Sequence, residues 1–338
     1  AKKRRMTITD LRSGTQNPQK LHDLAKRPLE KYIRSVEKVF RSSDKNPKKG
    51  MLSIAMNDHI SKTTLQNQEG DYLKLGDTDV MYEIVKKAFD ESKFKRCRPS
   101  PRSLYFAAKQ GNALQVLVLA SGCNVNATIP QEKHKTAMHA ASAAGHVNVL
   151  RLLCMVGGNL SCLDTNLQTP LFDAVENQRT EVVKFLISRD VNLNLKDSQG
   201  MTVLHVAAQK SNLEIINLLM ETRRLSVNEQ DNGGWTALMW TAEGMRKDVA
   251  RCLLKWGADV NILDTEQNTC LHWAALAGDT EIMDLLLGSN VHIDARNMFG
   301  ATALHISARE RKLPNIKTLE KYRPNVDIKN AEGKTAIE

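Results

Sequence analysis

Apolar and polar residues recur in a fixed order along the last two thirds of the chain. Each unit opens with a turn residue, often a glycine (Gly200, Gly234, Gly300 and Gly333), followed by a threonine and a short apolar stretch. A second stretch with apolar residues at helical spacing follows, as in EVVKFLI, EIINLLM, DVARCLL and EIMDLLL. Apolar positions three and four apart lie on one face of a helix. The pattern therefore predicts that each of these second stretches forms a helix.

The units recur at a regular period of about 33 residues. Their motifs are KTAMHAASAAGH, QTPLFDAVENQR, MTVLHVAAQKSN, WTALMWTAEGMR, NTCLHWAALAGD and ATALHISARERK, with threonines at Thr136, Thr169, Thr202, Thr236, Thr269 and Thr302. Ser103 lies one period before the first threonine, and Thr335 lies one period after the last. One such unit cannot bury its apolar face alone, whereas stacked neighbours bury it between them. The period therefore indicates a stacked array of repeats over 103–338.

These motifs resemble the ankyrin repeat, whose signature is T-P-L-H-x-A at a period of about 33 residues. The resemblance implies an all-α solenoid of about seven repeats over 103–338, the last one truncated. Each repeat then has a β-turn finger and two antiparallel helices, and no substantial sheet is expected across 103–330. The resemblance also implies that the motif histidines, His139, His205, His272 and His305, are scaffold hydrogen-bonding groups and not catalysts. Because a solenoid ends in a polar capping repeat, we expect the natural protein to continue past Glu338.

Residues 1–102 differ from the repeats in charge. They hold 24 Lys and Arg against 13 Asp and Glu, a net charge of +11, whereas 103–338 hold 24 against 25, a net charge of −1. We predict a basic N-terminal extension, partly helical or disordered, with helical stretches near 17–40 and 78–94. The KKRR run at 2–5 is typical of a nuclear import signal or of weak nucleic-acid contact. A solvated run of charges is an equally weighted alternative.

Composition narrows the possible functions. The 338 residues are 41% hydrophobic and 25% charged, and no apolar run approaches the roughly 18 residues of a membrane span, so no membrane partner is expected. The six cysteines are scattered without a C-x-x-C pair, which argues against a disulfide framework or a zinc site. No nucleophile–base pair and no cofactor-binding glycine loop stands out. We therefore expect no catalytic residue, metal or cofactor in this segment.

Three of the four tryptophans fall on variable positions of the repeat. Trp240 and Trp273 occupy the x of T-P-L-H-x-A, where other repeats carry Ala140, Asp173, Val206 and Ile306. Trp235 precedes the motif threonine, where other repeats carry Lys135, Gln168, Met201, Asn268 and Ala301. This variability predicts exposed positions. Equivalent helices pack about 8–10 Å apart, so the rings of Trp240 and Trp273 are predicted to face each other across a slot one side chain wide.

Glu243 lies three residues after Trp240, on the same helix face, so three indoles and a carboxylate are predicted to converge. Aromatic faces attract methylated ammonium groups, and a carboxylate can accept the N–H that mono- or dimethyl-lysine retains. A hydrophobic patch for an ordinary protein partner is the equally weighted alternative. Residues 229–294 hold eleven acidic and four basic residues, which favours a basic peptide. Trp256, at the end of an outer helix, is interpreted as packing or surface.

Four stretches are similar to the euchromatic histone H3 lysine-9 methyltransferases. They are SLYFAAKQG (103–111), DNGGWTALMWTAE (231–243), DTEQNTCLHWAA (264–275) and LHISARE (304–310). In that family the ankyrin array reads mono- and dimethylated lysine-9 of histone H3 through an aromatic cage. The resemblance implies a cage of Trp235, Trp240, Glu243 and Trp273, with Asp231, Asp264 and Glu266 lining the peptide path. This chain departs from the family at Gly244, Gln267 and Leu276, where the family has an aromatic residue or His, a Glu and a Phe.

The sequence therefore favours a methyl-lysine reader of the histone H3 tail. The resemblance implies a nuclear, chromatin-bound setting, as the non-catalytic part of a histone lysine methyltransferase whose catalytic domain lies beyond residue 338. Other methylated or chromatin proteins are further candidate partners. The alternative is a general ankyrin scaffold for protein–protein interaction that is indifferent to methylation.

Overall fold

A computed structural model describes residues 99–120 and 123–338. The helical stretches predicted near 17–40 and 78–94, and the KKRR run, lie outside the described residues. The chain separates into two compact units, Ala1–Cys162 and Leu163–Glu338. Within the described residues the secondary structure is helical, apart from the isolated β-bridges Ile129–Lys135 and Gln230–Thr236.

The described part of the first unit holds two helix pairs. They are α6 (Pro101–Lys109) with α7 (Ala113–Ala120), and α8 (Ala137–Ala144) with α9 (Val147–Met155). The Ser100 side chain caps α6 by accepting a hydrogen bond from the Ser103 N–H at 3.1 Å. The first helices of the two pairs pack on each other, and so do the second helices.

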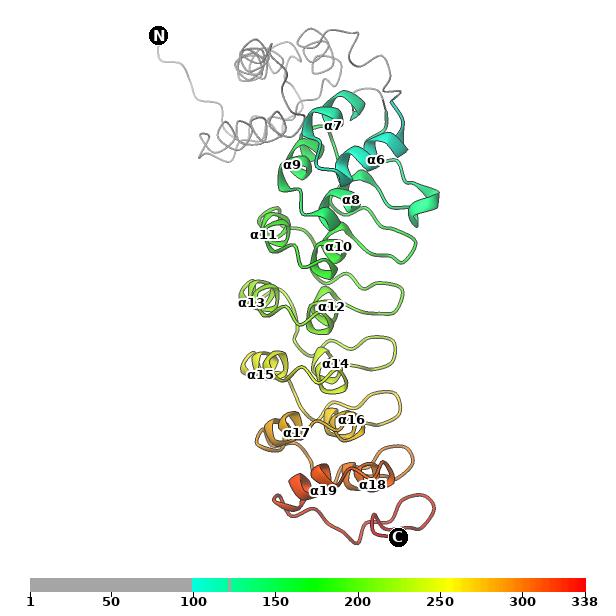
Figure 1. Ribbon diagram of the computed structural model, residues 1–338, viewed down its shortest axis with the longest axis vertical. Helices are drawn as coiled ribbons and strands as arrows, with labels where there is room; N and C mark the ends of the chain where they lie inside the picture. The colour runs from blue at the N-terminus through cyan, green and yellow to red at the C-terminus, as the bar shows by residue number, and fades with distance from the viewer. Residues whose placement is uncertain (1–98, 121–122) are drawn as a thin grey trace, which may run out of the picture. The chain divides into compact units, whose positions relative to one another are not determined.

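The second unit continues the same pattern over five helix pairs. They are α10 (Pro170–Glu176) with α11 (Thr180–Ser188), α12 (Val203–Gln209) with α13 (Leu213–Glu221), α14 (Ala237–Glu243) with α15 (Lys247–Lys255), α16 (Cys270–Ala277) with α17 (Thr280–Leu287), and α18 (Ala303–Arg309) with α19 (Leu313–Glu320). Figure 1 shows the first helices stacked in one row, beside the hairpin fingers, and the second helices in an outer row. The predicted two helices per repeat are confirmed.

The motif histidines join neighbouring repeats. His205 Nδ1 accepts the Thr202 N–H at 3.0 Å, and its Nε2 donates to the Trp235 carbonyl of the next repeat at 3.1 Å. His272 makes the same link to the Ala301 carbonyl at 3.1 Å. Burial lowers the pKa of both imidazoles, which favours the neutral ring that these paired roles require. The predicted scaffold role of these two histidines is confirmed.

The finger turns require a left-handed residue. The predicted turn glycines, Gly200, Gly234, Gly300 and Gly333, all have φ between 65° and 77°. A Cβ on Gly234 would lie 2.8 Å from the backbone nitrogen of Thr265 and 2.9 Å from Cα of Asp264. Leu167 and Gln267 adopt the same conformation, with φ of 59° and 62°. Glycine at these turns thus allows consecutive fingers to approach closely.

Candidate functional site

Asp231 and Asp264 each open a finger next to the tryptophans and stabilise its turn by hydrogen bonds. Asp231 Oδ1 accepts hydrogen bonds from the backbone N–H groups of Gly233 and Trp235, both at 2.9 Å. Asp264 Oδ1 accepts the two equivalent bonds in the next finger, at 2.9 and 2.8 Å. Each finger is therefore held by its own first side chain, as is typical of an Asx turn.

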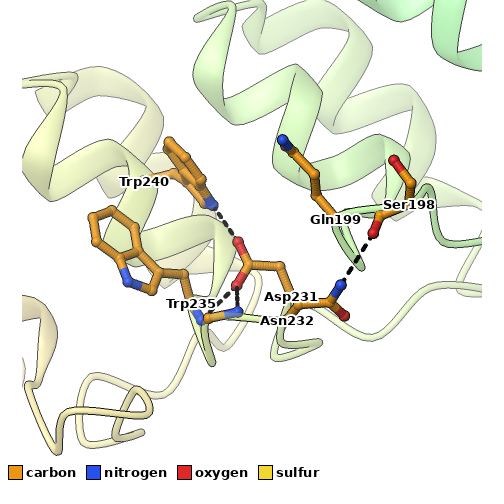
Figure 2. Close-up of a pocket in the computed structure, with 7 residues that line it drawn as sticks. Ser198, Gln199, Asp231, Asn232, Trp235 and Trp240 are labelled. Atoms are coloured by element: carbon orange, nitrogen blue, oxygen red, sulfur yellow. Dashed lines mark hydrogen bonds between the residues drawn. The ribbon is translucent and has the colours of Figure 1, made fainter. Parts of the chain in front are cut away.

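The second oxygen of each aspartate holds an indole. The Trp240 indole N–H donates to Asp231 Oδ2 at 3.0 Å (Figure 2), and the Trp273 indole N–H donates to Asp264 Oδ2 at 2.9 Å. Each pair is nine residues apart and joins a finger to the inner helix of the same repeat. Because the acceptor is a carboxylate, these are strong hydrogen bonds. They orient both rings before any ligand arrives.

Trp235 is held through its backbone. Its N–H donates to Asp231 Oδ1 at 2.9 Å, and its carbonyl accepts from His205 Nε2 at 3.1 Å. The residue is therefore anchored by its own finger on one side and by the preceding repeat on the other. The scaffold histidine thus helps to position the residue that carries this ring.

The three indoles form one contiguous cluster. The ring centroids of Trp235 and Trp240 are 4.9 Å apart with an interplanar angle of 51°, and those of Trp235 and Trp273 are 4.2 Å apart at 46°. The structure thus brings the three predicted rings together, from one finger and two inner helices. Trp235 contacts both of the others, so the tryptophan cluster, Trp235–Trp240–Trp273, is a continuous aromatic surface. The prediction that Trp240 and Trp273 face each other across an open slot was wrong, because the Trp235 ring packs on both of them.

The acidic residues take different positions around this cluster. Glu243 is exposed at the end of α14, three residues after Trp240, and the contacts that join the indoles do not include it. Glu266 is exposed on the finger. Asp264 is only 6% exposed, and its carboxylate accepts hydrogen bonds from its own finger and from Trp273. Asp264 therefore acts on the site through the indole that it orients.

The tryptophan positions are less exposed than the sequence predicts. In the x slot, Ala140, Asp173, Val206 and Ile306 are all buried, with exposures of 1–7%. The position before the threonine is mixed: Met201 and Asn268 are buried, whereas Lys135, Gln168 and Ala301 are half-buried. The prediction of an exposed x slot was therefore wrong, because that slot is packed against its surroundings. Trp240 and Trp273 are half-buried, since an indole is longer than the side chains these slots otherwise hold.

Trp256 lies apart from the cluster. Its indole N–H donates to the Asn217 side chain at 3.0 Å, at the end of α15, and the residue is half-buried. This contact joins the outer helices α13 and α15. This half-buried position agrees with the interpretation of Trp256 as a packing or surface residue.

Gly244, Gln267 and Leu276, where the sequence differs from the methyltransferases that it resembles, lie in three different local settings. The Arg246 guanidinium donates to the Trp240 carbonyl at 3.1 Å and occupies the space where a Cβ on Gly244 would lie. Glycine at 244 thus allows an arginine to close the end of α14. Gln267 takes the left-handed turn conformation, and Leu276 is 37% exposed.

Neither a membrane span nor a metal site is found within 99–120 and 123–338. Among these residues no helix is long and apolar enough to cross a bilayer. In the same ranges no group of three or more His, Cys, Asp or Glu side chains is arranged to hold a metal ion.

A family model for ankyrin repeats matches the chain in three copies, at 104–197, 189–264 and 257–330. The chain belongs to the ankyrin-repeat family. Its fold is similar to the crystal structure of the human ASB11 ankyrin repeat domain, with a TM-score of 0.59 and 25% sequence identity. That match covers 66% of this chain and 98% of the ASB11 chain. Ankyrin repeats are protein-interaction scaffolds, so a protein partner follows from the family.

The curated relatives that this chain is similar to include a cation channel and two palmitoyltransferases. The human transient receptor potential cation channel subfamily A member 1 is 31% identical over 190 residues, 53% of this chain and 17% of the channel. Palmitoyltransferase AKR1 of Debaryomyces hansenii is 29% identical over 232 residues, which are 64% of this chain and 28% of that enzyme. Palmitoyltransferase ZDHHC17 of Danio rerio is 31% identical over 197 residues, which are 57% of this chain and 32% of that enzyme. The chain spans less than a third of each relative, so any narrower function depends on its own site residues.

Proposed function

We propose that this ankyrin array reads mono- and dimethylated lysine-9 of the histone H3 tail through the tryptophan cluster. The supporting observation is one cluster of three indoles, in which the Trp235 ring contacts the other two and carboxylates orient Trp240 and Trp273. A methylated ammonium sheds water more readily than a bare one and is attracted to aromatic faces. Trp235, Trp240 and Trp273 supply those faces.

Charge supports a basic ligand. Residues 229–294 hold eleven acidic against four basic residues. An acidic surface speeds the encounter with a basic peptide and disfavours nucleic acid. Glu243 supplies the carboxylate of the cage and accepts the N–H of mono- or dimethyl-lysine, while Asp231 and Glu266 face the peptide and Asp264 orients Trp273.

The proposal places this segment within a larger chromatin enzyme. The chain serves as the non-catalytic reader of a nuclear histone lysine methyltransferase, with the basic residues 2–5 in nuclear import or a weak nucleic-acid contact. This setting depends on the sequence resemblance alone. The cage proposal depends on the residues of the cluster and is tested separately.

The alternative is a protein-interaction scaffold that ignores methylation. Close packing of Trp235 on both neighbours, with ring centroids 4.2 and 4.9 Å away, favours it. Tryptophans in such a cluster also anchor ordinary protein interfaces. The two functions differ in one property, the dependence of affinity on lysine methylation.

Calorimetric titration of H3-tail peptides with zero, one, two or three methyl groups on lysine-9 decides between them. The proposal expects mono- and dimethyl peptides to bind tightest, at an affinity on the order of micromolar. Trimethyl peptide should bind less well, and unmethylated peptide weakest. Equal binding of all four peptides would support the scaffold, as would no binding of any.

A further inference from the structure

A pocket lies beside the tryptophan cluster, toward the preceding finger (Figure 2). Its volume is about 360 Å³, and we call it the finger pocket; its lining side chains are Ser198, Gln199, Asp231, Asn232, Trp235 and Trp240. Trp273 and Glu243 do not line it. The finger pocket is therefore a surface that the methyl-lysine cage does not account for.

The walls of the finger pocket favour a cation. Two indoles line it together with Asp231, whose carboxylate accepts hydrogen bonds from the Trp240 indole and from two backbone N–H groups. No lysine or arginine is among the lining residues. Lys196, next to this finger, is paired with Glu229 at 3.1 Å. A cation in the pocket would thus meet aromatic faces and one negative charge.

The aromatic walls of the finger pocket and its amide acceptor favour a guanidinium over an ammonium. A guanidinium is planar, stacks on aromatic rings and is weakly hydrated, whereas the ammonium of lysine is compact and strongly hydrated. Figure 2 shows Gln199 and Trp240 extending from opposite sides of Asp231. Gln199 is exposed, and its amide oxygen is an acceptor for one of the five guanidinium N–H donors.

We propose that the finger pocket binds the guanidinium of a peptide arginine that lies close in sequence to the methyl-lysine. This proposal rests on the proposed function. Trp235 and Trp240 belong to both the cage and the finger pocket, so the two ligand side chains must lie close together. Equivalent elements of neighbouring repeats are about 8–10 Å apart, and an extended peptide advances about 3.3 Å per residue. The arginine is therefore within about three residues of the methyl-lysine.

The first test uses synthetic peptides and the wild-type chain. Short peptides of glycine, alanine and serine carry one dimethyl-lysine and one arginine at each neighbouring position in turn. Matched peptides replace the arginine with citrulline, which keeps the shape but loses the charge. At the preferred position, citrulline should weaken binding by about three- to thirtyfold, the range for a cation on an aromatic face.

The second test places a positive charge at the mouth of the finger pocket. Gln199→Lys should weaken the arginine-containing peptide about as much as citrulline does, and it should leave the citrulline peptide nearly unchanged. Asn166→Lys is the matched control, because Asn166 occupies the same fingertip position one repeat earlier. Both residues use their backbone carbonyl to accept a hydrogen bond from the next finger, at 2.9 Å for Gln199 and 2.8 Å for Asn166. Melting temperatures verify that both variants fold.

The outcomes separate this proposal from the proposed function. If dimethylation strengthens binding but citrulline matches arginine at every position, the finger pocket proposal is wrong and the reader function stands. If Gln199→Lys and Asn166→Lys weaken arginine peptides equally, the arginine is bound elsewhere. If dimethylated and unmethylated peptides bind equally, the reader function fails, whatever the arginine contributes.

Discussion

Two successive repeats have an aspartate at the same finger position, but its second carboxylate oxygen binds different partners and the x slot holds different side chains. Asp197 and Asp231 each open a finger and accept two backbone N–H groups through Oδ1. The Oδ2 of Asp197 accepts from the Gln168 amide at 3.1 Å, a bond between fingers, whereas that of Asp231 accepts from the Trp240 indole at 3.0 Å. In the x slot, Val206 is 7% exposed, while Trp240 is half-buried.

The comparison separates the needs of the scaffold from the needs of the site. The fold requires one aspartate oxygen, a threonine cap and a side chain that fills the slot. The hydrogen-bond partner of the second aspartate oxygen, and the length of the side chain in the x slot, can differ between repeats. A long side chain in the slot becomes an oriented surface group when the second oxygen holds it. Substitutions that exchange these features between repeats should therefore separate binding from stability.

The largest effect is expected from Trp273→Ala. It removes one wall of the cage, so the affinity for dimethyl-lysine peptide should fall by about 2 kcal/mol or more. The free energy of unfolding should fall by about 1–2 kcal/mol, less than for a fully buried tryptophan. Ile306→Ala, in the same slot of the next repeat, is the control: it should lower stability and leave affinity unchanged. Calorimetry and urea denaturation measure the two quantities, and equal affinity losses in both variants would contradict the cage.

Glu243→Gln is expected to act next most strongly. It removes the charge but keeps an acceptor oxygen, so affinity for mono- and dimethyl peptides should fall by about 1–3 kcal/mol. Trimethyl-lysine has no N–H to donate, so its binding should fall less. Glu176→Gln is a matched control, because Glu176 is exposed at the same register of α10. Equal losses for di- and trimethyl peptides would leave Glu243 only a long-range charge effect.

Asp264→Asn should have a smaller effect on binding. Asparagine keeps an oxygen for the finger N–H groups but presents an amide donor to the Trp273 indole N–H, which is also a donor. Loss of that orientation should cost about 1 kcal/mol of dimethyl-peptide affinity. At Asp197→Asn the facing Gln168 can turn its amide and present its oxygen, so this control should be nearly silent. If both variants bind like the wild type, orientation by Asp264 does not matter.

The smallest effect concerns acid stability. Burial lowers the folded-state pKa of His205 and His272 below the ordinary 6.5, so each binds its proton more readily when unfolded. Their contribution to stability is full above about pH 6.5 and is lost as pH falls toward the folded-state pKa. His205→Met, which copies Met239 of the cage repeat, should make this decline shallower. Urea denaturation between about pH 7.5 and pH 5 measures it, and an unchanged slope would show that His205 does not contribute.

The sequence pattern predicts the fold well and the site in part. The regular spacing of the motif threonines predicts the positions of the helices and the turn glycines. It also predicts that three tryptophans from two repeats lie close together. Burial of the x slot was missed, because variability at Val206 reflects interchangeable packing and not exposure. The Asp231–Trp240 bond has a signal, the nine-residue spacing repeated at Asp264–Trp273. The finger pocket depends on side-chain directions, which no spacing specifies.

The indole N–H resonances of the protein test the central claim most directly. The chain has four tryptophans, three in the cluster and Trp256 outside it, so the spectrum contains its own control. Titration with a dimethyl-lysine-9 H3 peptide should shift the signals of Trp235, Trp240 and Trp273 and leave that of Trp256 in place. The unmethylated peptide at the same concentration should shift none of them appreciably. Equal shifts with both peptides, or no shift at the cluster, would contradict methyl-lysine recognition by these three rings.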